Sequence, residues 1–131
     1  MNRIDAVVTA IDSFENITIV CFEAAGQPMR MMALELDKSL VVSSKVILGA
    51  KASNIALARE FSGMLSISNQ LKVTIESINS GKLLSSVKFS FAGSLTESII
   101  TRESVSRMNL QVGTNIIALI KSSELSILEI K

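Results

Sequence analysis

The sequence predicts an all-β protein, folded as a barrel or a sandwich, and three observations support this. Apolar and polar residues alternate with period two along most of the chain, as expected for half-buried strands whose side chains point to opposite faces. Short turn motifs separate these runs. The second half of the chain also repeats the pattern of the first.

Seven alternating runs are predicted to be strands. The clearest is Leu71–Ile75, where three apolar residues alternate with Lys72 and Thr74. The other runs are Ile4–Ile11, Asn16–Phe22, Val46–Ala50, Ser86–Phe91, Ile116–Ile120 and Leu125–Ile130. The turn motifs between them are Asp12-Ser13, Gly26-Gln27-Pro28, Asn79-Ser80-Gly81, Gly93-Ser94 and Gly113-Thr114.

Two segments have helical character. The segment Thr101–Met108 is the clearest short helix, because Thr101 is a suitable N-cap residue. The segment Ala52–Phe61 also contains good helix formers, but its tertiary context could impose an extended form. Both conformations stay open for this second segment.

An internal repeat divides the chain into two copies of one unit. A shift of 67 residues places Asn69 on Asn2 and Gly93 on Gly26, and a later shift of 70 residues places Lys121 on Lys51. Each copy has about 65 residues, which is marginal for independent folding. We therefore expect the copies to bury apolar surface against each other or against another subunit.

The composition argues against an enzyme and against several kinds of binding protein. The 131 residues carry a net charge of +1, so there is no basic field for nucleic acid. There is no His to serve as a catalytic base, and the single Cys21 excludes an intrachain disulfide or a Cys-rich metal site. No phosphate-binding glycine motif occurs.

The chain also shows no membrane or export signal. Its N-terminus lacks the features of a signal peptide, and no apolar run is as long as the ~18 residues of a membrane span. A cytoplasmic protein is therefore expected.

Small hydroxyl residues occur beside a lysine at matching places in the two copies. Lys121-Ser122-Ser123 follows one predicted strand, and Lys51-Ala52-Ser53-Asn54 follows its counterpart. A further polar cluster, Ser66-Ile67-Ser68-Asn69-Gln70, begins the second copy. Hydroxyl groups, backbone N–H groups and an ammonium together suit a tetrahedral dianion. They could equally be ordinary polar strand ends.

Four segments resemble the Mop, or TOBE, family of molybdate-binding domains. Ser66–Leu71 (SISNQL) resembles the S-x-R-N-Q-L opening of a Mop unit, and Thr96–Thr101 (TESIIT) resembles I-T-S-I-I-S. Ile120–Leu125 (IKSSEL) is similar to V-K-S-T-D-V, and Lys51–Ala58 (KASNIALA) to K-A-S-D-V-A-L-A. The resemblance extends over nearly the whole chain and is closer in the second copy.

This resemblance implies two tandem OB-like barrels, each with five antiparallel strands and one short helix, in residues 1–63 and 64–131. It further implies a cytoplasmic protein for molybdenum storage or homeostasis, assembled as a homotrimer with molybdate or tungstate at its subunit interfaces. No organic cofactor, directly ligated metal cation, nucleic acid or membrane is implied.

The resemblance also implies a set of oxyanion-binding residues. In the second copy these are Ser66, Ile67 through its backbone N–H, Ser68, Lys121 and Ser122, together with Thr96. In the first copy they are Lys51, Ser53, Asn2 and Arg3, with Arg30 as a further basic candidate.

This sequence departs from the family pattern at two positions. Ser68 replaces the arginine of S-x-R-N, and Ala52 matches Ser122. The first copy is therefore expected to bind weakly or only to assist assembly. Two alternatives remain open: a molybdate sensor that acts through a partner protein, and an assembly module without a ligand.

Overall fold

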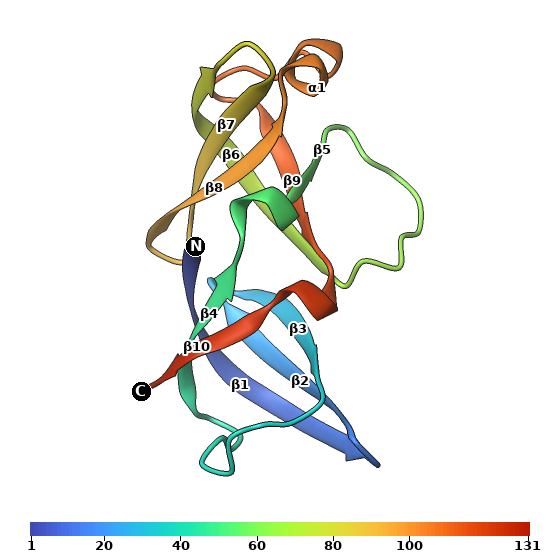
Figure 1. Cartoon of the computed structure of the whole chain (residues 1–131), viewed down its shortest axis with the longest axis vertical. Helices are drawn as coiled ribbons and strands as arrows, with labels where there is room; N and C mark the ends of the chain where they lie inside the picture. The colour runs from blue at the N-terminus through green and yellow to red at the C-terminus, as the bar shows by residue number, and fades with distance from the viewer.

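The computed structural model describes residues 1–131 and contains ten strands in two five-stranded antiparallel sheets. The sheets lie one above the other along the long axis of the molecule (Figure 1). The first has the order β10-β4-β1-β2-β3, with β1 (Asn2–Phe14), β2 (Ile17–Ala24), β3 (Gln27–Ala33), β4 (Lys45–Ala50) and β10 (Ser126–Ile130). The second has the order β5-β9-β6-β7-β8, with β5 (Ala56–Ala58), β6 (Asn69–Ser80), β7 (Leu84–Phe91), β8 (Ser94–Thr101) and β9 (Asn115–Ile120).

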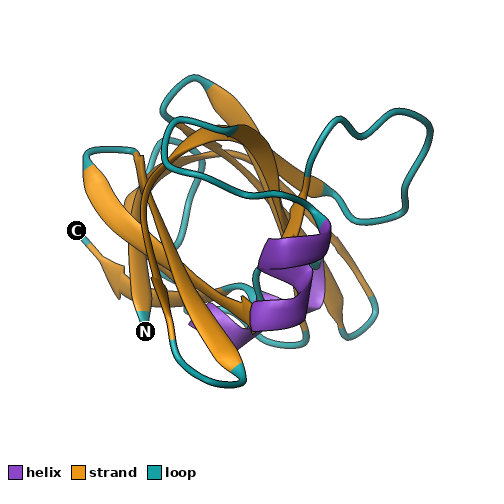
Figure 2. Cartoon of the chain, turned by 90° about the horizontal axis from the view of Figure 1, so that it is seen from above, coloured by secondary structure: helices purple, strands orange, loops and turns teal.

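The alternation in the sequence explains which side chains form the core. Along β1, Asn2, Ile4, Ala6 and Val8 are buried while the residues between them are exposed. The equivalent strand β6 has the same pattern from Asn69 onward. The buried apolar side chains of the two sheets form one continuous cluster, around which the strands curve (Figure 2).

The two sheets exchange their fifth strands. Strand β5 comes from the first half of the sequence but pairs with β9 in the second sheet, and β10 comes from the second half but pairs with β4 in the first. The expected division between residues 63 and 64 therefore separates the halves of the sequence, but it does not separate the sheets. The chain crosses between the sheets through two short 3-10 helices, η1 (Ala52–Asn54) and η2 (Ser122–Glu124).

The helix predicted in the second half is confirmed. Helix α1 (Arg102–Arg107) begins after Thr101, whose side chain accepts a hydrogen bond from the backbone N–H of Ser104. Between β3 and β4, however, the first half has turns and no α-helix, so the short helix of the first copy is the 3-10 helix η1 and not a counterpart of α1. There the Asp37 carboxylate accepts hydrogen bonds from the backbone N–H and the hydroxyl of Ser39, which favours a turn.

Two further segments differ from a simple sequence prediction. Ala52–Phe61 is not an α-helix, because it forms η1 and then the short strand β5. Strand β3 begins inside the predicted turn Gly26-Gln27-Pro28, and Pro28 is tolerated near the start of a strand at the edge of its sheet. None of the helices is long and apolar enough to cross a membrane.

Candidate functional site

Two buried asparagines join the sheets at equivalent positions. Asn69, at the start of β6, donates from Nδ2 to the carbonyl oxygen of Arg30 on β3 at 2.9 Å and accepts from its N–H at 2.7 Å. Asn2, at the start of β1, donates to the carbonyl oxygen of Glu97 on β8 at 2.8 Å and accepts from its N–H at 2.9 Å. We call these contacts the Asn69 junction and the Asn2 junction.

The Asn69 junction collects several of the residues predicted from the sequence. A surface pocket of about 420 Å³ is lined by Arg30, Ser66, Ile67 and Ser68. The other lining residues are Thr9, Cys21, Phe22, Pro28, Met29, Leu65 and Gln70.

The lysine of the second copy lies at the same junction. Asn69 is paired with Ile120 in the ladder between β6 and β9, and its Nδ2 also donates to the carbonyl oxygen of Ile120 at 2.9 Å. Ser68 precedes Asn69 and Lys121 follows Ile120, so the two residues lie side by side where this ladder ends. Ser122 comes next, as the first residue of η2, which contacts β3.

The Asn69 junction offers hydrogen-bond donors and positive charge without a compensating carboxylate. The backbone N–H groups of Ser66, Ile67 and Ser68 donate to no acceptor within the chain. Arg30 and Lys121 form no ion pair, and none of the residues lining the pocket is acidic. A small anion is the ligand whose chemistry matches this set of groups.

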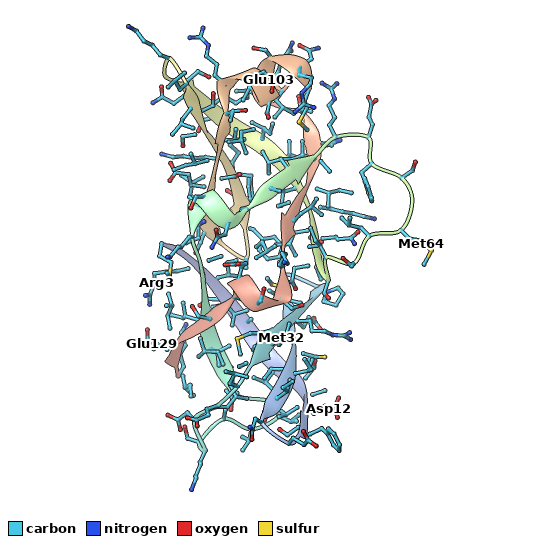
Figure 3. The ribbon with its side chains drawn as sticks, turned by 45° about the vertical axis from the view of Figure 1, so that its right-hand side comes forward. Arg3, Asp12, Met32, Met64, Glu103 and Glu129 are labelled. Carbon is cyan, nitrogen blue, oxygen red and sulfur yellow. The ribbon has the colours of Figure 1, made fainter.

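The remaining predicted residues belong to the other junction. Lys51 follows Ala50, which pairs with Asn2, and Ser53 lies in the following 3-10 helix. Arg3 forms an exposed ion pair with Glu129 at 3.0 Å. Figure 3 shows both side chains on the same flank of the molecule.

Thr96 and Arg30 are placed differently from the arrangement expected from the sequence. Thr96 lies on β8 next to Glu97, at the Asn2 junction, and its buried hydroxyl has no hydrogen-bond partner. Arg30, expected in the first copy, lies with Ser66–Ser68 of the second. The reason is that β3 and β8 each contact the asparagine of the opposite half, which no pattern within one half can reveal.

Sequence reasoning also missed Cys21. It lies directly opposite Arg30 in the pairing of β2 with β3 and lines the same pocket. Its only signal in the sequence was its position in an alternating run, which specifies a face of a strand but not a neighbour on the next strand.

Comparison with models of protein families gives a match to part of the chain. Residues 65–127 match the model of the TOBE domain, so this part of the chain carries a TOBE domain. None of the curated protein sequences matches the chain.

A solved crystal structure is also similar to this chain over most of its length. The chain is similar to a crystal structure of the cytoplasmic molybdate-binding protein ModG with molybdate bound. The two share 26% sequence identity and superpose with a TM-score of 0.89. The match covers 96% of this chain and 94% of the ModG chain, so it extends over both sheets.

Proposed function

We propose that the chain is a cytoplasmic, non-enzymatic protein that binds molybdate or tungstate at the Asn69 junction and stores or buffers it. The observation that carries this proposal is that Arg30, which has no acidic partner, lines a pocket of free donors. Lys121, which also forms no ion pair, lies beside Ser68 at the adjacent end of the β6–β9 ladder. The likeness to a molybdate-binding protein over 96% of the chain supports it.

Each group in the proposed site has a distinct task. Lys121 and Arg30 neutralise the two charges of the anion, while Ser66, Ser68 and Ser122 donate through their hydroxyls. Ile67 donates through its backbone N–H. Arg30, supplied by β3, takes the place of the arginine that Ser68 replaces.

Gln70 stabilises the loop that supplies these donors. Its side-chain amide donates to the carbonyl oxygen of Ile67 at 2.9 Å, which holds that carbonyl against Gln70. Because the carbonyl is already bound, the loop presents its N–H groups rather than an acceptor to the anion. The N–H, guanidinium and ammonium groups only donate, so they favour MoO₄²⁻ over a protonated oxyanion, while the serine hydroxyls can donate or accept.

We further propose that the two sheets form OB-like barrels and that copies of the chain assemble as a trimer around the anion. The pocket is open to solvent on one side, so a second copy can cover it. Met64, two residues before Ser66, is fully exposed on the same loop, and Leu65 is partly exposed. Apolar side chains in such a position are typical of a protein contact.

Isothermal titration calorimetry with molybdate, tungstate and sulfate tests this function. We expect heat of binding from the first two anions in the wild type and its loss in Lys121→Ala and Arg30→Ala. Lys82→Ala is the matched control, since Lys82 is exposed and forms no ion pair. No binding of either anion by folded protein would refute the proposal.

Cys21 provides an independent test of the location. Because Cys21 is the only cysteine and lines the pocket, molybdate should slow its reaction with a maleimide. An unchanged labelling rate at saturating molybdate would place the anion elsewhere.

Light scattering with and without molybdate tests whether the chain forms a trimer. Capture of a partner protein only in the presence of molybdate would favour the sensor alternative.

A further inference from the structure

We infer that Glu97 excludes the oxyanion from the Asn2 junction, so that each chain binds the anion at the Asn69 junction alone. This inference rests on the proposed function. It concerns the Asn2 junction, which the internal repeat makes equivalent to the Asn69 junction. It explains why a chain with two such junctions would bind the anion at one of them.

The two junctions have the same backbone geometry. In each, an asparagine at the start of a long strand makes paired hydrogen bonds, between 2.7 and 2.9 Å long, with both backbone groups of one residue on the other sheet. In each, a lysine follows the strand residue paired with that asparagine. These shared asparagine contacts therefore do not explain why one junction would bind an anion and the other would not.

The residue bound by the asparagine differs in charge. At the Asn69 junction it is Arg30, and at the Asn2 junction it is Glu97, which stands 67 positions later and is its repeat equivalent. A dianion at the Asn2 junction would meet a carboxylate where the other junction presents a guanidinium. A carboxylate is an acceptor only, so it repels the anion and offers no hydrogen bond.

The neighbours of Glu97 hold its carboxylate in place. The hydroxyl of Ser86 on β7 donates a short hydrogen bond to Oε2 of Glu97. Lys88 lies directly opposite Glu97 in the pairing of β7 with β8, but the two form no ion pair within 4.0 Å. The negative charge of Glu97 is therefore fixed at the junction and is not cancelled by a direct partner.

A second pair of repeat-equivalent residues, Thr9 and Glu76, shows the same kind of difference in charge. Thr9 lines the pocket at the Asn69 junction, and its repeat equivalent at the other junction is Glu76. The Asn69 junction thus has Arg30 and Lys121 and no acidic residue in its pocket. At the Asn2 junction, the carboxylates of Glu76 and Glu97 offset the cations Lys51 and Lys88, and Arg3 is already ion-paired with Glu129.

Counting bound molybdate by equilibrium dialysis tests the inference, using wild type, Arg30→Ala, Glu97→Arg and the double variant. Arg30→Ala should abolish binding completely. At saturating molybdate, Glu97→Arg should add as many ions per chain as Arg30→Ala removes, because each junction occurs once in a chain. The added ions should bind more weakly, because Ala52 takes the place of Ser122 there. The double variant should bind as many ions as the wild type, at the Asn2 junction.

Glu97→Gln and Glu15→Gln separate charge from geometry. Glu97→Gln removes the repulsion without adding a cation, so we expect weaker additional binding than in Glu97→Arg. Glu15→Gln, at an exposed turn, makes the same change in net charge and should bind as the wild type does. Far-ultraviolet circular dichroism verifies that each variant is folded.

Each outcome decides one question. If the wild type binds no molybdate, the proposed function fails. If the wild type binds but Arg30→Ala keeps part of its sites, or folded Glu97→Arg gains none, the function stands and the role of Glu97 is refuted.

Discussion

Replacement of Asn69 by alanine is the most informative single perturbation of this fold. The Asn69 side chain is 0% exposed and makes three hydrogen bonds to backbone groups. Two of them reach Arg30 on the first sheet, and the third reaches Ile120 on the second. Removal of the amide therefore takes one hydrogen bond from the N–H of Arg30 and one each from the carbonyls of Arg30 and Ile120, and it breaks a direct tie between the sheets.

The expected cost follows from this count. A buried hydrogen bond contributes about 1 kcal/mol net to the free energy of unfolding, so three bonds amount to about 3 kcal/mol. The cost rises if the two carbonyls stay dry after the substitution. Asn69→Asp should cost at least as much, because a carboxylate can still accept from the Arg30 N–H but donates to neither carbonyl.

Urea unfolding measures this effect. At a slope of about 2 kcal/mol/M, a loss of about 3 kcal/mol lowers the midpoint by about 1.5 M. Asn2→Ala is the matched comparison, since Asn2 is 9% exposed and makes two such bonds, so it should lose about 2 kcal/mol. A loss below about 1 kcal/mol for Asn69→Ala would refute the view that these amides hold the sheets together.

Three further predictions test other parts of the structure. Thr96→Val should raise the free energy of unfolding by about 1 kcal/mol in urea titrations, because the buried Thr96 hydroxyl has no partner, and a loss of stability would contradict this. Gly49→Ala should lower the free energy of unfolding by about 1 kcal/mol, because a Cβ would approach the side chain of Leu128 within 2.7 Å and disturb β10. An unchanged urea midpoint would contradict this. Hydrogen bonds from Ser39, first from its side chain and second from its backbone, lower the pKa of the Asp37 carboxyl. The ionised carboxylate therefore stabilises the fold at pH values above its unfolded-state pKa, and this contribution disappears as the pH falls through its folded-state pKa. In Ser39→Ala, nuclear magnetic resonance titration should find the pKa of Asp37 closer to its ordinary value.

The candidate site was only partly predictable from the sequence. The polar cluster Ser66–Ser68 and the lysine at Lys121 could be found because they end strands that the hydrophobic pattern already marks. Their neighbour Arg30 could not be assigned, since it lies 36 residues before Ser66 and only the packing of β3 against β6 brings the two together. Thr96, which the resemblance groups with the second-copy residues, lies next to Glu97 at the Asn2 junction for the same reason.

The sequence by itself determined the class of fold and the position of most strands, because a period of two in hydrophobicity specifies which face of a strand is buried. It also determined the start of α1, because the hydroxyl of Thr101 caps its own neighbouring backbone. Such features depend on residues close together in the chain.

Only the tertiary structure decided which strands pair with each other. Strands β5 and β10 could each have completed the sheet of its own half, because backbone donors and acceptors are the same in both. The exchange places them in opposite sheets, and the residues just before them, Ile55 and Leu125, are buried in one shared core. Alternation cannot encode that choice, because it states that a side chain is buried without stating against which strand.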